Sequence, residues 1–323
     1  MKALVVSALS PDLSGCALAD VAPPVRAPGQ LLVRVGAAAL NYPDLLMTRG
    51  DYQLKPPLPF VPGMEIAGEV LDADAGGAYR IGDRVVCGTR TGGFAQIVAC
   101  DAAAARAVPP GLTMAQAASI GTAYLTAYVA LVRLARVQPG EWVLVHGATG
   151  GVGLAAIDLA RVLGARVIAT SRSPAKLAIV AADYAPDATL PAAGFRDAVK
   201  ALTGGGGADV VVDPVGGDVF DESVRAIAFG GRLLVIGFTG GRIATVPTNL
   251  PLIKGFAVIG VRAGEYGRRF PRLGTENRDA VWALAASGAI RPRIHRIYAL
   301  ADWQAAFRAM AASDLVGKLV IEP

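Results

Sequence analysis

Residues 141–170 read EWVLVHGATGGVGLAAIDLARVLGARVIAT, and this stretch decides the fold class. Its first six residues are predicted to form a buried strand, with the apolar run WVLV at 142–145. A glycine-rich turn follows at 147–153, a helical pattern then runs to Gly164, and a second strand starts at Arg166. Strand, glycine turn, helix and strand within ~30 residues are typical of a βαβ unit that binds a dinucleotide.

Each position of the turn has a physical reason. Ala148 allows the tight turn, Gly150 lets the backbone approach a pyrophosphate, and Gly153 lets helix and strand pack closely. The helix starts at the same place, so its unpaired N–H groups and positive dipole end face the phosphates. We therefore expect the cofactor to lie on Ala148, Gly150, Gly151, Val152 and Gly153.

The end of the second strand indicates which dinucleotide binds. An NAD site usually places Asp or Glu there, about 20 residues after the turn, to accept from the ribose 2′-OH. Residues 169–173 read ATSRS, so no acid is available. A 2′-phosphate would instead meet the Ser171 hydroxyl, the Arg172 guanidinium and the Lys176 ammonium. The pattern favours NADPH, and the alternative is a solvated helix start with incidental basic residues.

The rest of the chain shows two different patterns of predicted secondary structure. Strand-like runs separated by Pro- and Gly-rich connectors fill the first third and predict a small barrel-like β domain. These runs are 1–6, 31–35, 65–70, 84–87 and 94–98. A capped helical stretch is expected from Thr113 to about Val137.

Beyond the glycine turn, apolar runs alternate with helical segments, which predicts a doubly wound parallel sheet. Its further strands are expected at 209–213, 232–236 and 257–261. Residues 282–323 should hold two helical segments and a last strand at 318–321 that returns to the first domain.

Composition limits the function classes. A chain of 323 residues with 53% hydrophobic and 18% charged residues is expected to form two folded domains. The net charge of +5 favours anionic ligands, but a diffuse surface excess fits equally well. The sequence contains no long run of Lys or Arg, so nucleic-acid binding is not supported. No signal peptide or membrane-length apolar run is visible, so we expect a cytoplasmic protein without a membrane partner.

Three cysteines, Cys16, Cys87 and Cys100, lie far apart in the sequence. They form no Cys-x-x-Cys pair and cannot supply a four-cysteine zinc site. We expect them to be free and mostly buried.

Several further segments occur in a family-like order along essentially the whole chain. They are Asn41-Tyr42-Pro43-Asp44, PFVPGMEIAG at 59–68, GDRV at 82–85, GGFA at 92–95, DPVGG at 213–217 and GKLV at 317–320. With the glycine turn, they resemble the medium-chain dehydrogenase/reductase superfamily, and within it the zinc-independent quinone oxidoreductase branch, the ζ-crystallin-like group.

The resemblance implies an α/β fold of two domains. A GroES-like, β-barrel-type catalytic domain would occupy residues 1–118, completed by 275–323. A Rossmann domain with a doubly wound parallel sheet would occupy 119–274 and bind NADPH.

The resemblance also predicts that no metal is bound. Zinc-dependent relatives carry Cys at the position of Asn41 and Gly-His-Glu where this chain has Gly63-Met64-Glu65. Neither Asn41 nor Met64 is a credible zinc ligand, and His146 and His295 are the only histidines. Alcohol dehydrogenation through zinc is therefore not expected.

Without a metal, the cofactor carries the chemistry and the protein supplies position and electrostatics. A hydride acceptor would be a carbon conjugated to a carbonyl, as in a quinone or an α,β-unsaturated carbonyl compound. Charge then develops on oxygen and needs a donor. The resemblance places Asn41 and Tyr52 near the nicotinamide and the substrate, and tyrosine is regarded as the proton donor in related enoyl reductases. Tyr52 could instead be a packing aromatic, Asn41 could merely fix a turn, and solvent could supply the proton.

Further cofactor contacts carry over by position. Thr126 resembles a threonine on the nicotinamide side, and Lys318 is expected to approach the cofactor. The loop residues Ile236, Gly237 and Phe238, with Val261, should flank the ribose and ring beyond the carboxyl ends of the strands. His146 is interpreted as structural and His295 as a surface residue.

These inferences predict an NADPH-dependent quinone oxidoreductase. The alternative enzyme reduces an activated C=C bond in an enoyl- or acryloyl-type substrate. A third reading is a non-catalytic NADPH-binding or RNA-binding protein. Because relatives are usually dimers joined through the nucleotide domain, we also expect a homodimer.

Overall fold

The computed structural model describes residues 1–323 and divides them into two compact units. Unit 1 comprises Met1–Thr122 and Pro292–Pro323, and unit 2 comprises Ala123–Arg291. The functional boundaries expected at 118/119 and 274/275 stay a prediction.

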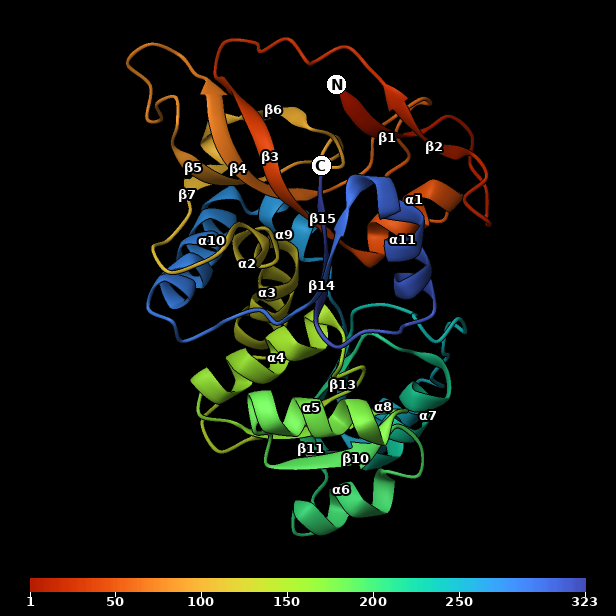
Figure 1. The fold of residues 1–323 in the computed structure, drawn as a ribbon. Coiled ribbons are helices and arrows are strands. Elements are labelled where there is room, and N and C mark those ends of the chain that lie inside the picture. Colours follow the sequence, from red (N-terminus) through yellow and green to blue (C-terminus); the bar gives the residue numbers. More distant parts are fainter. The chain divides into compact units, whose positions relative to one another are not determined.

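Unit 1 is built around one long strand, β3 (Gln30–Leu40). It pairs antiparallel with β4 (Glu65–Asp72), with β6 (Ile97–Asp101) and, at its far end, with β15 (Lys318–Glu322). The C-terminal strand therefore lies beside β3, as Figure 1 shows, which confirms the predicted return of the chain.

The main sheet has the order β14-β15-β3-β4-β5-β7, and β1 and β2 form a separate pair. Buried Leu, Val, Ile and Phe side chains from these strands form the core of unit 1. The remaining elements are β1 (Lys2–Val6), β2 (Cys16–Asp20), α1 (Tyr42–Arg49), β5 (Arg84–Gly88), the 3-10 helix η1 (Ala102–Ala104), β7 (Ala105–Ala107), α2 (Met114–Ala118), β14 (Ile294–Ala299), the 3-10 helix η3 (Leu300–Asp302) and α11 (Trp303–Ala311).

One strand of unit 1 is shifted from its predicted place. The sequence predicted residues 94–98, whereas β6 covers Ile97–Asp101. Phe94 and Ala95 instead meet β1, since the Leu4 amide donates to the Phe94 carbonyl at 2.9 Å and Ala3 bridges to Ala95. The apolar run is thus shared between two different partners.

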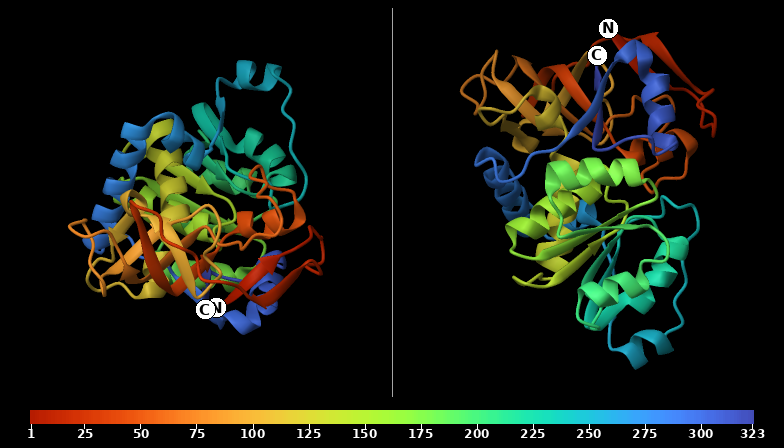
Figure 2. Two further views of the ribbon diagram at one scale, coloured as in Figure 1. Left: turned by 90° about the horizontal axis from the view of Figure 1, so that it is seen from above. Right: turned by 60° about the horizontal axis from the view of Figure 1, so that its bottom comes forward.

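Unit 2 contains a six-stranded sheet in the order β10-β9-β8-β11-β12-β13, and every pair in it is parallel. Helices cover both faces (Figure 2), which explains why its central strands are apolar throughout. The strands are β8 (Trp142–Val145), β9 (Arg166–Ser171), β10 (Ala188–Pro191), β11 (Ala208–Asp213), β12 (Ile227–Val235) and β13 (Ala257–Gly260). The helices are α4 (Gly151–Val162), α5 (Pro174–Tyr184), α6 (Arg196–Leu202), α7 (Gly217–Ala226), α8 (Asn249–Lys254), α9 (Ala263–Arg269) and α10 (Pro271–Ala286). The predicted doubly wound sheet is confirmed.

The helical stretch expected from 113 to 137 is not one continuous helix. It begins with the predicted cap, because the Gln116 amide donates to the Thr113 hydroxyl at 3.1 Å. The chain then leaves the helix at Ser119 and re-enters it as α3 (Gly121–Tyr128), followed by a π-helical segment η2 (Val129–Leu134). The predicted helical stretch is therefore divided into three segments.

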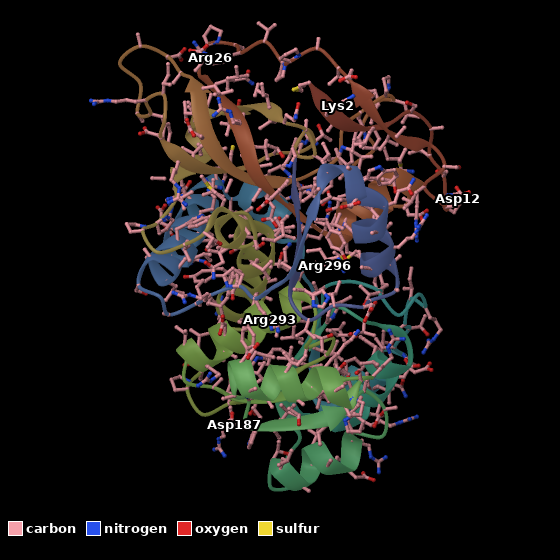
Figure 3. All side chains as sticks on the ribbon, viewed as in Figure 1. Lys2, Asp12, Arg26, Asp187, Arg293 and Arg296 are labelled. Atoms are coloured by element: carbon pink, nitrogen blue, oxygen red, sulfur yellow. The ribbon has the colours of Figure 1, made fainter.

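Charged side chains are dispersed over unit 1. Lys2, Arg26 and Arg296, labelled in Figure 3, come from three separate segments. Arg26 donates to Asp72 at 2.9 Å and also to Asp74, so its charge is compensated locally. Unit 1 contains 13 Lys and Arg and 13 Asp and Glu residues, so the net charge of +5 comes from unit 2. In neither unit is any helix long and apolar enough to cross a membrane.

Candidate functional site

The glycine-rich turn of unit 2 closes directly after β8. Gly147 adopts a left-handed conformation with φ 57°, and its carbonyl accepts from the Gly150 amide at 3.0 Å. The buried Ala148 donates from its amide to the Thr170 carbonyl of β9 at 3.1 Å. The turn is therefore fixed to both strands of the βαβ unit.

Close packing explains one of the glycines. A Cβ on Gly153 would lie 2.3 Å from the Gly147 carbonyl oxygen, which no side chain can accommodate. A Cβ on Gly150 would meet only that oxygen, at 3.5 Å. Gly153 thus serves the helix–strand contact, whereas Gly150 faces open space that suits an approaching phosphate.

Helix α4 begins at this open side. Gly150 precedes it in an extended conformation, and no side chain caps the helix. The amides of Gly151, Val152 and Gly153 in its first turn have no acceptor within the helix. They form a donor set that suits an anion.

The end of β9 carries the residues predicted to contact the 2′-phosphate. Ser171 is buried and its hydroxyl accepts from the Ser173 amide at 3.3 Å, while Ser173 caps α5 by accepting from the Lys176 amide at 3.3 Å. Arg172 is exposed and its guanidinium has no partner within the chain. An unpaired cation at this strand end, with no acid among residues 169–173, fits a phosphorylated cofactor.

His146 directly follows β8 and is fully buried. Its Nδ1 lies 2.8 Å from the Thr170 hydroxyl and its Nε2 lies 2.8 Å from the Ser223 hydroxyl. Because Ser223 donates its own hydrogen to the Val219 carbonyl at 2.7 Å, it must accept from His146, so Nε2 carries the proton. Burial lowers the pKa of His146 to about 3. The side chain is a neutral link between strands and helix, which confirms the structural interpretation.

The other predicted contacts of unit 2 lie at the carboxyl edge of the sheet or on α3. The loop with Ile236, Gly237 and Phe238 follows β12, and the Ile236 amide donates to the Asp213 carbonyl at 2.9 Å. Val261 follows β13 and is buried. Thr126 is half-buried on α3. Their roles toward a cofactor stay predictions.

Asp213, at the end of β11, was not among the predicted site residues. One carboxylate oxygen accepts from the amides of Val215 and Gly216 at 2.8 and 2.9 Å, and the other is buried without a partner. Burial raises the pKa of Asp213. An acid at the carboxyl end of a parallel strand, before a Pro-Val-Gly-Gly turn, was the signal in the sequence.

Unit 1 gathers four polar side chains that are distant in the sequence. Asn41 precedes α1, Asp44 lies in its first turn, Glu65 starts β4 and Lys318 starts β15. The Lys318 ammonium donates to the Asn41 amide oxygen at 2.6 Å and to Glu65 Oε1 at 3.0 Å. All four residues are at most 6% exposed. The structure therefore brings together Asn41 and Lys318, two residues that the sequence placed in the site separately.

Asp44 holds the start of α1 in place. Its two carboxylate oxygens accept from the backbone amides of Asn41, at 2.9 Å, and Gly63, at 3.0 Å. Burial is the largest effect on the pKa of Asp44 and raises it to about 7. The two backbone amides and the charge of Lys318 act in the opposite direction but are weaker. Asp44 and Glu65 were not predicted as site residues, although both lie in the quoted motifs.

Tyr52 lies beyond the C-terminus of α1. It is half-buried and packs against the core of unit 1, and its hydroxyl has no hydrogen-bond partner in the chain. The structure does not join Tyr52 to Asn41. Its hydroxyl is free to bind a ligand.

The three cysteines are free and buried, as expected, and His295 is exposed. No three His, Cys, Asp or Glu side chains are grouped so that they could hold a metal ion.

Known proteins resemble the chain in both units. The "Alcohol dehydrogenase GroES-like domain" family matches residues 27–110, and the "Zinc-binding dehydrogenase" family matches residues 151–276. Quinone oxidoreductase-like protein 2 of Mus musculus is 37% identical over 94% of this chain and 87% of its own length. The quinone oxidoreductase of Thermus thermophilus, solved also in complex with NADPH, is 32% identical with a TM-score of 0.88, and the match covers 100% of both chains.

A segment of a much longer protein is also similar. The Mycocerosic acid synthase-like polyketide synthase of Mycobacterium tuberculosis is 34% identical over 94% of this chain, which corresponds to 14% of the synthase.

The two units and these similarities define a medium-chain dehydrogenase/reductase, with a GroES-like domain and a Rossmann-type sheet. The chain belongs to the quinone oxidoreductase-like family of that superfamily and is an oxidoreductase.

Proposed function

We propose that this protein is an NADPH-dependent quinone oxidoreductase that works without zinc. The observation that carries the proposal is the end of β9, where the unpaired Arg172 guanidinium stands next to Ser171 and no acid is present. A solved relative that binds NADPH supports the same cofactor. The quinone oxidoreductase-like relatives support the same class of substrate.

The residues of unit 2 would hold the cofactor. The first-turn amides of α4 would bind the pyrophosphate, and Arg172, Ser171 and Lys176 would bind the 2′-phosphate. The loop Ile236–Phe238, Val261 and Thr126 would flank the nicotinamide side. NADPH, when bound, supplies the hydride.

The residues of unit 1 would act on the substrate oxygen. Reduction places negative charge on this oxygen, and a donor fixed in advance stabilises that charge. Asn41 and Tyr52 are the predicted residues near this position. The free Tyr52 hydroxyl would donate a proton, unless solvent does so in quinone reduction.

A second candidate is reduction of an activated C=C bond in an enoyl- or acryloyl-type substrate. Similarity to a segment of a polyketide synthase favours it, because a chain-building synthase handles acyl thioesters. The unpaired Tyr52 hydroxyl fits the proton donor that this reaction requires.

Parallel assays test the two reactions. A quinone and an enoyl thioester are offered separately to the enzyme with NADPH, and the loss of NADPH absorbance is followed. Faster turnover of the quinone is expected. Rates no higher than background with both substrates would remove the enzymatic proposal.

We further propose that the chain forms a homodimer through unit 2, in the cytoplasm. Strand β13 is an edge strand with one neighbour, and its Val258 side chain is 38% exposed. Phe229 of β12 is 87% exposed. Apolar groups at an unpaired strand edge favour pairing with a second chain. Light scattering that gave the mass of a single chain would refute it.

A further inference from the structure

The cluster of Asn41, Asp44, Glu65 and Lys318 contains only one free hydrogen-bond donor, and it is not on the residue that the sequence suggested. The sequence named Asn41 as a candidate to stabilise charge on the substrate oxygen. Each polar hydrogen and acceptor in the cluster can be assigned from the hydrogen-bond distances.

The side-chain amide of Asn41 has no free hydrogen that it could donate to a ligand. Its Nδ2 group donates to the Ala39 carbonyl at 3.2 Å and to Glu65 Oε1 at 2.9 Å, which uses both hydrogens. Its oxygen accepts from Lys318 at 2.6 Å. A flipped amide would set an oxygen against two acceptors and an NH₂ group against an ammonium, so this orientation is the favoured one. Asn41 therefore cannot donate to a substrate.

The two carboxylates are also occupied. Glu65 accepts from Asn41 and Lys318 on Oε1 and from the Thr122 amide on Oε2, at 2.7 Å. Both oxygens of Asp44 accept from backbone amides. Neither acid is placed to exchange a proton with a ligand, and both serve to fix their neighbours.

Lys318 is the exception. An ammonium has three hydrogens, and Lys318 directs one to Asn41 and one to Glu65. No protein group accepts the third. The side chain is 6% exposed, so water has little access to it, yet the cluster is not sealed. A buried donor without a partner is costly, and an acceptor brought by a ligand would remove that cost.

We propose that Lys318, rather than Asn41, donates the hydrogen bond that stabilises the oxygen of the reacting carbonyl, and that Asn41 and Glu65 are positioning residues for its ammonium. This assignment rests on the proposed function, in which the residues around Asn41 face the substrate. It makes Lys318 a catalytic residue of unit 1.

The step balances without an added reactant. The hydride adds to the acceptor carbon, the π electron pair moves to the carbonyl oxygen, and that oxygen becomes an enolate or hydroquinone anion. Lys318 keeps its proton and donates a hydrogen bond to the anion. The proton that completes the reduction comes from Tyr52 or solvent.

A charge-neutral pair of substitutions tests the proposal. Lys318→Met alone would leave Glu65 buried without its cation, so the double variant Lys318→Met/Glu65→Gln is compared with it. The matched control is Arg232→Met/Glu141→Gln, which removes a 2.7 Å ion pair of unit 2 that was not predicted to bind a ligand. Lys318→Arg serves as the conservative variant.

The first readout is independent of turnover. 4-Nitrophenol, whose phenolate mimics the anionic oxygen, is bound to each protein in the presence of NADP⁺, and its ionisation is read from its visible absorbance. Wild type, Lys318→Arg and the control pair should lower the pKa of the bound probe. Lys318→Met/Glu65→Gln should not. Equal ionisation in all proteins, or no phenolate signal with wild type, overturns the proposal.

The second readout separates substrate from cofactor. We expect kcat to fall about 10²- to 10³-fold in Lys318→Met/Glu65→Gln, as for loss of one oxyanion donor, with the Kd of NADPH nearly unchanged. A weakened Kd with an unchanged kcat would assign Lys318 to the cofactor and overturn the proposal. If wild type reduces neither substrate class, the proposed function fails, while the ionisation of the probe still decides the role of Lys318.

Discussion

His146 allows a quantitative prediction about acid stability. It is fully buried, its ring nitrogens are both engaged by hydroxyls, and burial lowers its pKa from 6.5 to about 3. The unfolded chain therefore binds a proton on His146 at a higher pH than the folded chain does. The contribution of a neutral His146 to stability is complete above pH 6.5 and is lost as the pH falls towards 3.

The size of the effect follows from the pKa difference. Within this window each pH unit costs about 1.4 kcal/mol of unfolding free energy per group. Between pH 6.5, where the unfolded histidine is already half protonated, and about pH 4.5, His146 should therefore lower the unfolding free energy by roughly 2 kcal/mol. Asp44 acts in the opposite direction, because its pKa is raised from 3.8 to about 7 and its protonation favours the folded chain as the pH falls.

A comparison of variants isolates the histidine. The unfolding free energy of wild type and of His146→Gln is measured by urea denaturation over this pH range, so that the shared contribution of Asp44 cancels. The variant should be less stable at neutral pH, because it loses a buried ring and a hydrogen bond. Its disadvantage should shrink by roughly 2 kcal/mol on acidification.

The only other histidine provides the control. His295 is exposed, and measuring His295→Gln in parallel shows whether the pH-dependent loss belongs to His146. A difference between wild type and His146→Gln that stayed constant with pH would refute the argument, because it would mean that His146 is not held neutral.

Other predictions concern the cofactor and the substrate. Arg172→Ala should weaken NADPH binding by roughly 1–3 kcal/mol and leave NADH binding little changed, as measured by fluorescence titration; equal losses would remove Arg172 from the phosphate site. Gly153→Ala should lower the unfolding free energy by at least ~1–3 kcal/mol, because its Cβ would overlap the Gly147 carbonyl oxygen, whereas Gly150→Ala should cost less. Similar costs for the two alanines would contradict the packing argument. Tyr52→Phe should slow enoyl reduction more than quinone reduction, and parallel losses would indicate a packing role. Elemental analysis of the purified protein should find no stoichiometric zinc; one zinc per chain would end the zinc-free proposal.

The sequence predicted local structure well where the pattern was strong. The apolar strands of unit 2 and the glycine turn are confirmed, because a buried parallel strand and a βαβ turn have signals contained within a few residues. Prediction was weaker at short or edge strands. Strands β2, β7, β10 and β14 were not anticipated, because they are short and each has at most one buried residue.

Errors arose where one segment serves two partners. The run 94–98 was predicted as one strand, but its first residues pair with β1 and its last residues pair with β3. The helix expected up to Val137 is interrupted near Gly121, where the Glu65 carboxylate accepts from the Thr122 amide. Neither contact has a signal in the local sequence.

The sequence by itself determined the nucleotide turn, since strand, turn and helix are consecutive and each glycine has a local reason. It also determined the absence of an acid at the end of β9, from which NADPH was inferred. Only the tertiary structure decided the state of Asn41. Its side-chain amide is saturated by Ala39, by Glu65 and by Lys318, which lies 277 residues away, and the free donor is on the lysine. Residue type gives the number of hydrogens that a side chain can donate, but how many remain free depends on neighbours that only folding brings together.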